Sequence, residues 1–544
     1  MSLQTKPAVR IISDVESWPM EVQEKSSGFT DWIGSAEEAA APIVAGIWTL
    51  NDCNGSEEII EANYDEVKFV LSGRSVWEDV TTGEEMTALK GSIIWIPKGS
   101  RTRIKGSSNF STFYVEQTYR PASLIKNPPL LTNGKVQALL GNLIHQYSRD
   151  NPLSRKHFEE ATEHLPGGNT RSVLHYDPFP VVMKSGNGCY LESLDGGKYT
   201  DLVSEYSAAM LGHSHEIIFQ TVQDVIKRGL NFGSPIAEEA ALAKLIKGRF
   251  PSMEQLRFCN SGTEANMLAL SVSLQYNGRE KVMVFKNGYH GGLINFGSKP
   301  NPLNAPFNFV LAPYNDIEGC MELVDDTIGA IIVEPMQSAG GMIPATEEFL
   351  RFLRQAADFV GSVLIFDEVV TSRLHYYGMQ GHFNVRPDMT TLGKYIGGGF
   401  SFGVFGGRYD IMKSLDPRTG MSHSGTYNNN IFTMVAGIAT SKVLTAEKIE
   451  RTNQIGNKLR EGIQNLVAAK KTTLIRITGY GSALGLHFGG STPAALRDAL
   501  FFYLLQRGIY IGKRGFMFLN IMHDESHVDA VLKGISDFID DISL

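Results

Sequence analysis

The sequence predicts an α/β protein with a parallel-rich sheet, preceded by a smaller all-β barrel. Two patterns lead to this fold class. In the longer C-terminal part of the 544-residue chain, short apolar runs alternate with helical stretches, as in proteins with a parallel sheet. Before it, short strands are punctuated by glycines, which is typical of a small barrel or jelly roll. A chain of this length holds about three domains.

The barrel is predicted from three short segments near the N-terminus. Glu66–Gly73 is an apolar strand closed by a glycine, Gly91–Gly99 ends in a Pro-Lys-Gly turn, and Phe110–Val115 alternates. The polar, proline-containing stretch Arg120–Pro129 is expected to be a linker. Val136–Tyr147 is expected to be a helix that begins the second unit.

The parallel sheet is predicted from three apolar runs, Val282–Phe285, Ala330–Val333 and Val363–Phe366, which are typical of strands buried on both faces. Helical stretches lie between them, among them Glu264–Tyr276 and Glu347–Phe359. In open α/β sheets, ligands bind beyond the carboxyl ends of the strands. Polar clusters that follow the apolar runs are therefore candidate site residues.

Composition narrows the class of protein. The net charge of −8 argues against nonspecific binding to nucleic acid or to an anionic membrane. No run of about 18 apolar residues occurs and the first residues are not apolar, so neither a membrane helix nor a secretory signal is expected. None of the four cysteines forms a CxxC pair, which favours reduced core thiols of a cytoplasmic protein. They are Cys53, Cys189, Cys259 and Cys320.

Two polar clusters are candidates for binding a flat anionic molecule. Asn260–Glu264 lies between the strand Leu256–Cys259 and a helix, where glycine, serine and threonine suit a phosphate site. An ordinary helix N-cap is the alternative. Tyr289, within Gly288–Gly291, follows the next strand and could stack on a planar ring, or it could be a buried tyrosine of a loop.

Two further clusters carry charge. Asp367 directly follows an apolar strand, where a carboxylate is costly unless it meets a cation such as a protonated pyridine nitrogen. A helix cap or a structural ion pair is the alternative. Lys394 stands in the glycine-rich stretch Leu392–Gly399, where burial would lower its pKa and suit an imine-forming amine. Alone, it would be expected to be a surface lysine in a flexible loop, which is the default for any single lysine.

The order of the four clusters is more specific than any one of them. A phosphate site, a stacking aromatic, an acid for a ring nitrogen and a lysine follow one another along one sheet. Asp367 and Lys394 are 27 residues apart, which leaves room for one helix and a short strand. The sequence therefore predicts that Lys394 carries pyridoxal 5′-phosphate (PLP) as a Schiff base.

These residues resemble the class III aminotransferases of PLP fold type I, in which a large domain with a parallel-rich sheet is joined to a small α+β domain. The resemblance runs from about Ser154 to the C-terminus. The matching motifs are SGTEAN at Ser261–Asn266, GYHG at Gly288–Gly291, EPMQSAGG at Glu334–Gly341, FDEV at Phe366–Val369, LGKYIGGG at Leu392–Gly399 and GTYNNN at Gly425–Asn430.

The resemblance implies roles for the residues around the cofactor ring. Lys394 would form the internal aldimine and move a proton between the substrate carbon and the cofactor. Asp367 would hold the pyridinium, while Val369 and Tyr289 would lie against the two faces of the ring. The expected catalytic residues are therefore Lys394 and Asp367.

The resemblance also implies a phosphate site and an assembly. Ser261, Gly262 and Thr263 would hold the phosphate, helped by Thr426 from a neighbouring subunit, and Glu334 would support the polar edge of the cofactor. Family members are dimers with sites at the interface, so a homodimer is expected.

Two subgroups of this family resemble the sequence, because Leu165–Pro180 occurs in similar form in both. They are the β-amino-acid aminotransferases, typified by β-phenylalanine aminotransferases, and glutamate-1-semialdehyde 2,1-aminomutase. The stretches Phe366–Leu374, Leu392–Arg408 and Phe501–Phe516 resemble the first group more. An aminomutase usually has a Gly-Phe-Arg stretch after Asp-Glu-Val, where this chain has Thr371–Leu374. Transamination of a β-amino acid or related amine with an oxo acid is expected, with the aminomutase as the alternative.

Two arginines are candidates for the substrate carboxylate. Arg171 and Arg514 match carboxylate-binding positions of the β-amino-acid group, and the planar guanidinium can bind a carboxylate through two hydrogen bonds. Either arginine could instead make a structural salt bridge. This alternative has more weight for Arg514, because the adjacent Lys513 departs from the expected pattern.

The N-terminal region resembles a short cupin of the EutQ kind in two half-motifs, Tyr64–Gly73 and Gly91–Gly99. All 13 histidines lie at His145 or later, so the imidazole ligands of a cupin metal site are missing and no metal is expected. A structural, oligomerisation or ligand-sensing role is expected instead.

The domain boundaries follow from both resemblances. We expect a cupin-like barrel at 1–125, a linker and helix at 126–153, and the aminotransferase at 154–544. Its large domain would span about 205–435, and its small domain 154–204 and 436–544. A PLP-binding sensor with vestigial catalysis is a third possibility, which the complete set of expected catalytic residues disfavours.

Overall fold

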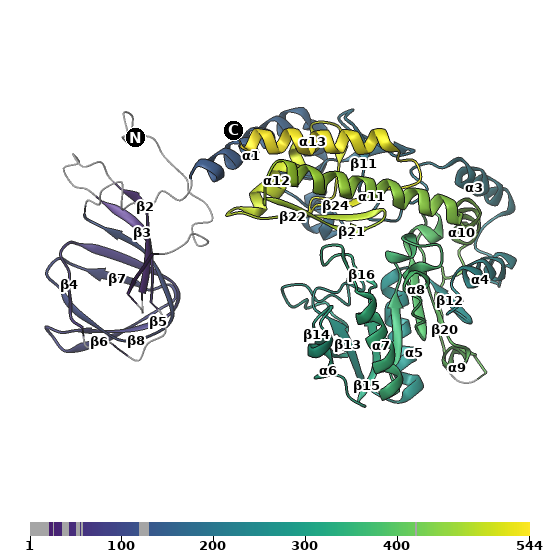
Figure 1. Ribbon diagram of the computed structural model, residues 1–544, viewed down its shortest axis with the longest axis horizontal. Helices are drawn as coiled ribbons and strands as arrows, with labels where there is room; N and C mark the ends of the chain where they lie inside the picture. Colours follow the sequence, from purple (N-terminus) through teal and green to yellow (C-terminus); the bar gives the residue numbers. More distant parts are fainter. Residues whose placement is uncertain are drawn as a thin grey trace. The chain divides into compact units, whose positions relative to one another are not determined.

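The structure is a computed structural model that describes residues 21–24, 27–34, 43–50, 55, 58–118, 130–418 and 421–543. The chain forms two compact units, Met1–Lys135 and Val136–Leu544, each with its own sheets and core (Figure 1). The stretch Arg120–Pro129, expected to be a linker, and Cys53 lie outside the described residues.

The first unit is an antiparallel sheet with the strand order β1-β2-β3-β8-β5-β6, in which β4 also pairs with β8 and β7 with β5. Its core consists of inward-facing apolar side chains, among them Val70, Trp77 and Phe110. The strands are β1 (Glu21–Glu24), β2 (Ser27–Gly34), β3 (Val44–Leu50), β4 (Ile60–Glu61), β5 (Glu66–Asp79), β6 (Glu84–Leu89), β7 (Ile93–Ile96) and β8 (Arg101–Glu116).

Strand β5 continues past Gly73, where the sequence predicted its end. Gly73 has φ 72° and lies at a register shift between β5 and β8. A Cβ atom there would lie 2.1 Å from the carbonyl oxygen of Asn109. The glycine therefore forms a bulge that bends the strand, which a sequence cannot distinguish from a turn. The β-rich character of this unit is as predicted.

The second unit is built on a sheet with the order β12-β20-β19-β18-β15-β13-β14. Strand β20 is antiparallel to β12 and β19, and the other neighbouring strands of this sheet are parallel. The predicted apolar runs form β13, β15 and β18, and β15 and β18 are buried along their whole length. The strands are β12 (Gln255–Cys259), β13 (Lys281–Phe285), β14 (Asn308–Ala312), β15 (Ile328–Val333), β18 (Val363–Asp367), β19 (Met389–Gly393) and β20 (Gly403–Gly407).

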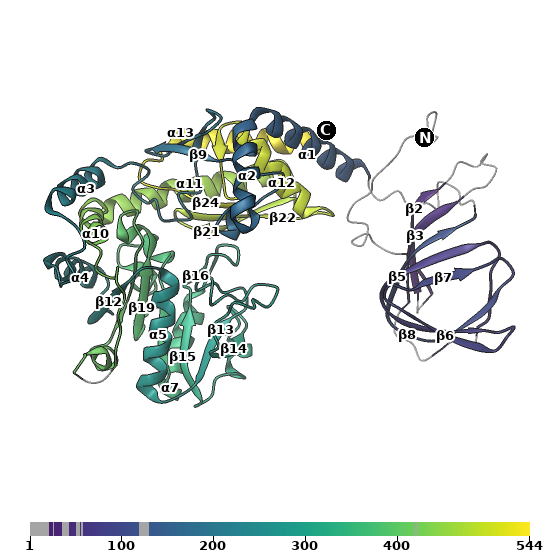
Figure 2. The ribbon, with the colours of Figure 1, turned by 180° about the vertical axis from the view of Figure 1, so that it is seen from behind.

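Helices cover both faces of this sheet (Figures 1 and 2). Side chains of α5 pack with one set of strand residues and those of α7 with the alternate set. Ser261 caps α5 and Thr346 caps α7, each by accepting a backbone N–H hydrogen bond. The helices of this domain are α3 (Glu216–Arg228), α4 (Ala237–Arg249), α5 (Gly262–Asn277), α6 (Ile317–Met321), α7 (Glu347–Val360), α8 (Gly378–Phe383), α9 (Tyr409–Met412) and α10 (Ile431–Val443).

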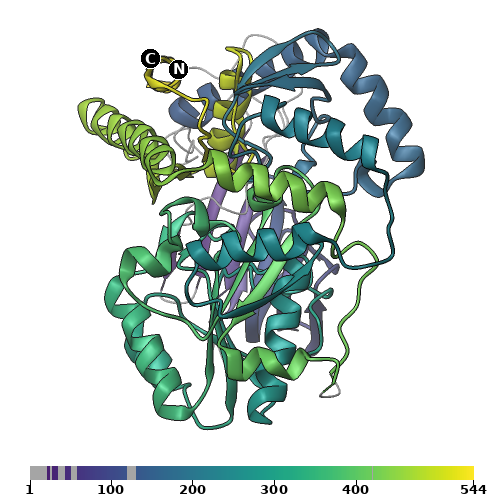
Figure 3. The same ribbon diagram turned by 90° about the vertical axis from the view of Figure 1, so that its right-hand side faces the viewer.

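Smaller sheets and five further helices complete this unit, and Figure 3 gives a second view of its ribbon. The sheets are β23-β11-β10-β9, β21-β22-β24 and the pair β16-β17. Helices α1 and α11–α13 contribute side chains to one core with strands of the first two of these sheets. The helices are α1 (Leu130–Asp150), α2 (Pro152–His164), α11 (Ala446–Ala469), α12 (Pro493–Leu505) and α13 (Glu525–Ser543). The strands are β9 (Met183–Asn187), β10 (Tyr190–Ser193), β11 (Lys198–Asp201), β16 (Met336–Gln337), β17 (Ile343–Pro344), β21 (Ile475–Tyr480), β22 (Ala483–Phe488), β23 (Ile509–Tyr510) and β24 (Phe516–Phe518).

The predicted α/β class is thus confirmed, and the helix expected at Val136–Tyr147 lies within α1. Among the described residues, no helix has both the length and the apolar character needed to cross a bilayer.

Candidate active site

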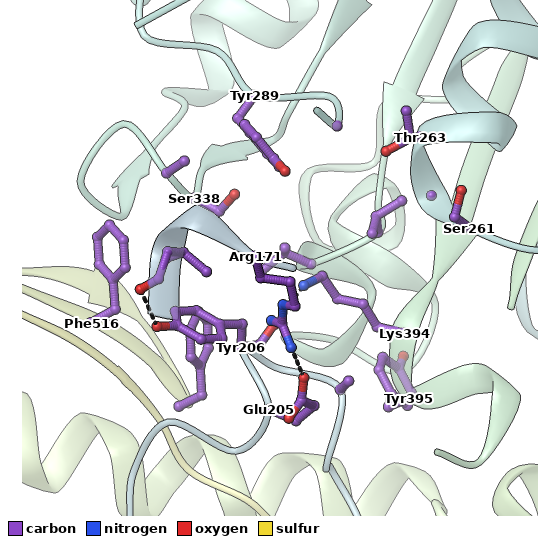
Figure 4. Close-up of a pocket in the computed structure, with 18 of the residues that line it drawn as sticks. Arg171, Glu205, Tyr206, Ser261, Thr263, Tyr289, Ser338, Lys394, Tyr395 and Phe516 are labelled. Carbon is purple, nitrogen blue, oxygen red and sulfur yellow. Dashed lines mark hydrogen bonds and ion pairs between the residues drawn. The ribbon is translucent and has the colours of Figure 1, made fainter. Parts of the chain in front are cut away.

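A cavity of about 1730 Å³ opens where strands β18 and β19 end. Ten of the residues predicted from sequence line it, and Thr426 does not. Figure 4 shows Arg171, Tyr289 and Lys394 pointing into the same space. The ten are Arg171, Ser261, Gly262, Thr263, Tyr289, Glu334, Asp367, Val369, Lys394 and Arg514.

Lys394 follows β19 directly and has a left-handed backbone with φ 55°. Its Nζ donates a hydrogen bond to the carbonyl oxygen of Tyr206, 2.6 Å away. Burial, followed by the positive charge of Arg171, lowers the pKa of Lys394 to about 8. Far more of this amine is therefore neutral near neutral pH than of an ordinary lysine, as a nucleophilic amine requires.

Asp367 ends β18 and is held by three donors. Its Oδ2 accepts hydrogen bonds from Nδ1 of His290 and Nδ2 of Asn266, both at 2.8 Å, and its Oδ1 accepts one from the N–H of Val369 at 3.0 Å. Burial by itself lowers the pKa of His290, but the hydrogen bond and negative charge of Asp367 outweigh it, and the pKa is raised. These three contacts thus fix the orientation of the Asp367 carboxylate, which lines the cavity.

The first turn of α5 offers a site for an anion. Ser261 is the N-cap and accepts the N–H of Glu264 at 3.1 Å, while the N–H groups of Gly262 and Thr263 have no acceptor within the helix. A Cβ atom on Gly262 would lie 2.9 Å from Cγ1 of Val369, so only glycine fits between the helix and this side chain. Free N–H groups and the helix dipole together attract a phosphate.

Glu334 is buried and ties two loops to the cavity wall. Its carboxylate accepts the N–H of Tyr289 at 2.9 Å, the N–H of Ser338 at 3.0 Å and the hydroxyl of Ser338 at 2.6 Å. Burial raises the pKa of Glu334. The side chain of Tyr289 remains 41% exposed at the cavity, so its ring is available to stack on a ligand.

The two candidate arginines have different surroundings. Arg171 forms an ion pair with Glu205 and lies 5.3 Å from the ring centre of Tyr206. Arg514 donates to the carbonyl oxygen of Ala339 at 3.0 Å and has no carboxylate partner among the described residues. The neighbouring Lys513 pairs with Asp498 and does not line the cavity.

Sequence reasoning missed four residues that shape this cavity: Asn266, His290, Glu205 and Tyr206. Asn266 and His290 stand inside motifs that were recognised, so their types and positions were a usable signal. Glu205 and Tyr206 belong to no such motif. They enter the site through an unusual backbone turn at 204–207, in which every residue has positive φ.

The polar groups that line the cavity fit PLP. The first turn of α5 suits its phosphate, Asp367 suits a protonated ring nitrogen, and the partly neutral Lys394 suits its aldehyde carbon. The space between Gly262 and Val369, which a Cβ atom would fill, keeps the cavity open beside the helix. The fold and this site together define a PLP-dependent enzyme of fold type I.

Comparisons with known proteins give the family. Residues 172–539 match the model "Aminotransferase class-III", and residues 26–123 match "Ethanolamine utilisation protein EutQ". The chain is 41% identical over 424 residues to the β-phenylalanine transaminase of Variovorax paradoxus, covering 75% of this chain and 98% of that protein. The crystal structure of the β-phenylalanine aminotransferase from that organism superposes with a TM-score of 0.72 over 74% of this chain and 97% of that chain, at 42% identity.

Two other relatives complete the comparison. The glutamate-1-semialdehyde 2,1-aminomutase of Methanothermobacter thermautotrophicus is 34% identical over 414 residues, covering 71% of this chain and 98% of that protein. A transaminase with PLP bound has a TM-score of 0.68 at 29% identity, over 72% of this chain and 98% of that chain. The chain belongs to the class-III aminotransferases, and PLP is its cofactor.

Proposed function

We propose that the enzyme transfers the amino group of a β-amino acid or related amine to an oxo acid, with the cofactor bound to Lys394. The observation that carries this proposal is the convergence of Lys394, Asp367 and the first turn of α5 on one cavity that also contains Arg171 and Arg514. Its support from relatives is the 41% identity to a β-phenylalanine transaminase.

In the proposed site, Ser261, Gly262 and Thr263 bind the phosphate, and Asp367 binds the ring nitrogen. When bound, PLP supplies an electron-withdrawing ring that makes the hydrogen on the amine-bearing carbon of the substrate acidic. Val369 and Tyr289, which both line the cavity, would contact the two faces of this ring. Glu334 holds the backbone of Tyr289 in place.

Lys394 has two roles in this proposal. Its Nζ would hold the cofactor between turnovers, and the amine of Lys394, when free, would move a proton at the substrate carbon. Its pKa of about 8 suits both tasks, because the amine is neutral often enough to accept a proton and basic enough to hold it.

Arg171 and Arg514 are proposed to bind the carboxylates of the two substrates. Among the described residues, Arg514 donates hydrogen bonds only to a backbone carbonyl, so its guanidinium is ready for an anion. Arg171 is paired with Glu205 at a partly exposed position, so a substrate carboxylate must compete with that side chain. An exposed ion pair is weak enough for this exchange.

An aminomutase is the second candidate, favoured by the 34% identity to glutamate-1-semialdehyde 2,1-aminomutase. It would move an amino group within one substrate and would need no acceptor. Activity that disappears when the oxo acid is left out supports the transaminase. Turnover of a single amino aldehyde without any acceptor supports the aminomutase.

The enzyme is also proposed to be a homodimer in the cytoplasm. Thr426 is exposed and lies outside the cavity of its own chain, which fits a contribution to the phosphate site of a neighbouring subunit. Cys189, Cys259 and Cys320 are buried thiols without disulfides, as in a reducing compartment. For the histidine-free unit at the N-terminus, a structural, assembly or ligand-sensing role is proposed.

The substrate proposal is tested by a half-reaction screen. The cofactor-loaded enzyme is mixed with single amines, and the visible absorbance of the cofactor is followed as it converts to its amino form. β-Amino acids should convert it faster than α-amino acids of equal size. Conversion by α-amino acids alone would contradict the proposal.

A further inference from the structure

The segment Ser204–Ser207 has an unusual backbone. Its four residues have φ angles of 45°, 50°, 50° and 78°, and none is glycine. Left-handed backbone is unfavourable for residues that carry a Cβ atom, and it normally occurs at single positions. A run of this kind persists only where the surrounding structure holds it, and such strain collects at functional sites.

Buried polar groups hold one side of this turn. The carboxylate of Asp201 accepts the N–H of Val203 at 2.8 Å and the N–H of Ser204 at 3.1 Å. The hydroxyl of Ser204 donates to the carbonyl oxygen of Phe518 at 2.8 Å and accepts from Nδ2 of Asn520 at 3.1 Å. Both Asp201 and Ser204 are almost inaccessible to solvent, so these bonds are protected from water.

A buried cation lies on the other side of the turn. Arg373 is fully buried and has no carboxylate partner among the described residues. Its guanidinium donates to the carbonyl oxygen of Leu519, to the hydroxyl of Ser482 at 3.1 Å and, weakly, to the carbonyl oxygen of Ser207 at 3.5 Å. The guanidinium of Arg373 thus donates its hydrogen bonds to acceptors in and beside the turn.

The turn presents one group to the reacting lysine. The carbonyl oxygen of Tyr206, at the centre of the left-handed run, lies 2.6 Å from Nζ of Lys394. A carbonyl oxygen only accepts, so this contact holds Nζ while the amine still carries its hydrogens. Once Nζ is bonded to the cofactor, it has fewer hydrogens to offer.

We propose that the turn Ser204–Ser207 is the docking point for the free amine of Lys394, with Ser204 and Arg373 as positioning residues. This inference rests on the proposed role of Lys394 as the cofactor-bearing residue. During turnover the amine leaves the cofactor and must stay within reach of the substrate carbon. The Tyr206 carbonyl gives it a fixed resting place and stabilises its protonated form.

The test measures the amine in the full-length protein after removal of the cofactor. Brief acetylation with acetic anhydride over a range of pH values is followed by mass spectrometry of the peptide that contains Lys394. The pH midpoint of labelling gives the pKa of this amine, expected near 8 in the wild type. This readout does not depend on activity.

Ser204→Ala removes the hydroxyl that fixes the turn. We expect the midpoint to fall by about half a unit or more, because the ammonium loses its acceptor. Ser362→Ala is the matched control: Ser362 is also buried and its hydroxyl donates to the carbonyl oxygen of Ile328 at 2.6 Å, away from the cavity. Its midpoint should equal that of the wild type. An unchanged midpoint in Ser204→Ala would overturn the inference.

Arg373→Lys is the second variant, in case Ser204→Ala does not fold. It replaces the planar fork by a single ammonium group, and the midpoint should again fall. The charged groups that act on the amine are Arg171, Glu205, Asp367 and Arg373, and Ser204→Ala changes none of them. Loss of the charge at position 373 would raise the midpoint, because Arg373 lowers the pKa of Lys394, so a fall in either variant reports a change in position.

The two proposals fail in different ways. If Lys394→Ala still binds PLP with the absorbance of the wild type, the role of Lys394 is wrong. If Lys394→Ala behaves as expected but the labelling midpoint is unchanged in Ser204→Ala, or in Arg373→Lys where Ser204→Ala does not fold, only the docking point is wrong.

Discussion

Nδ1 of His290 lies 2.8 Å from Oδ2 of Asp367, and both side chains are almost completely buried. The pair places an imidazole with a raised pKa beside the carboxylate that is proposed to bind the ring nitrogen. Removing one partner of a buried pair leaves the other charge uncompensated. We therefore predict that His290→Ala destabilises the fold by roughly 3–5 kcal/mol, measured by urea unfolding.

The pH dependence of this pair has a definite sign. The pKa of His290 is raised in the folded protein, so its ionic contribution is complete below the unfolded value of 6.5 and is lost as the pH rises through the folded pKa. His290→Asn keeps a donor but cannot become charged, so its deficit in unfolding free energy should shrink as the pH rises. The exposed His145, changed to Asn, should show no such trend. A deficit that grows with pH would contradict the ion pair.

Asp367→Asn should lower turnover by about 10²–10³-fold, because the variant keeps the shape but loses the charge that holds a proton on the ring nitrogen. Asp388→Asn is the control. Asp388 is also buried and also accepts a backbone N–H, from Leu364 at 2.8 Å, but it does not line the cavity. It should lose stability without a matching loss in kcat. Equal losses of kcat in both variants would count against the assigned role of Asp367.

Cofactor uptake should depend on the ionisation of Lys394. The pKa of this amine is lowered to about 8, and only the neutral form attacks the aldehyde. The rate of PLP uptake by the cofactor-free protein, followed by stopped-flow absorbance, should therefore rise with pH and level off above about 8. If the rate keeps rising up to pH 10.5, the ordinary pKa of a lysine, the amine is not buried as described.

The effect of replacing Arg171 or Arg514 on KM should depend on whether the substrate carries a carboxylate. Arg171→Met and Arg514→Met should each raise KM for a carboxylate substrate by about 10–100-fold, the typical strength of a hydrogen-bonded charge pair. The same variants should leave the KM of an amine without a carboxylate nearly unchanged. Lys513→Met, next to Arg514 but outside the cavity, should change neither value. Identical losses on both kinds of substrate would assign the arginines a structural role.

The ends of the buried strands could be predicted from sequence because apolar runs and the polar residues after them are local signals. Ser261, Asp367 and Lys394 were found in this way, and all three line the cavity. The turn at Glu205 and Tyr206 could not be predicted. Nothing in those residue types favours left-handed backbone, which arises from contacts with residues far away in the chain.

The most direct test of the central claim is to locate the cofactor on the chain. The purified enzyme, loaded with PLP, is reduced with borohydride, digested and mapped by mass spectrometry. We predict one pyridoxyl adduct, on Lys394, and loss of the visible cofactor band in Lys394→Ala. An adduct on another lysine, or a cofactor band that survives in Lys394→Ala, would contradict this account.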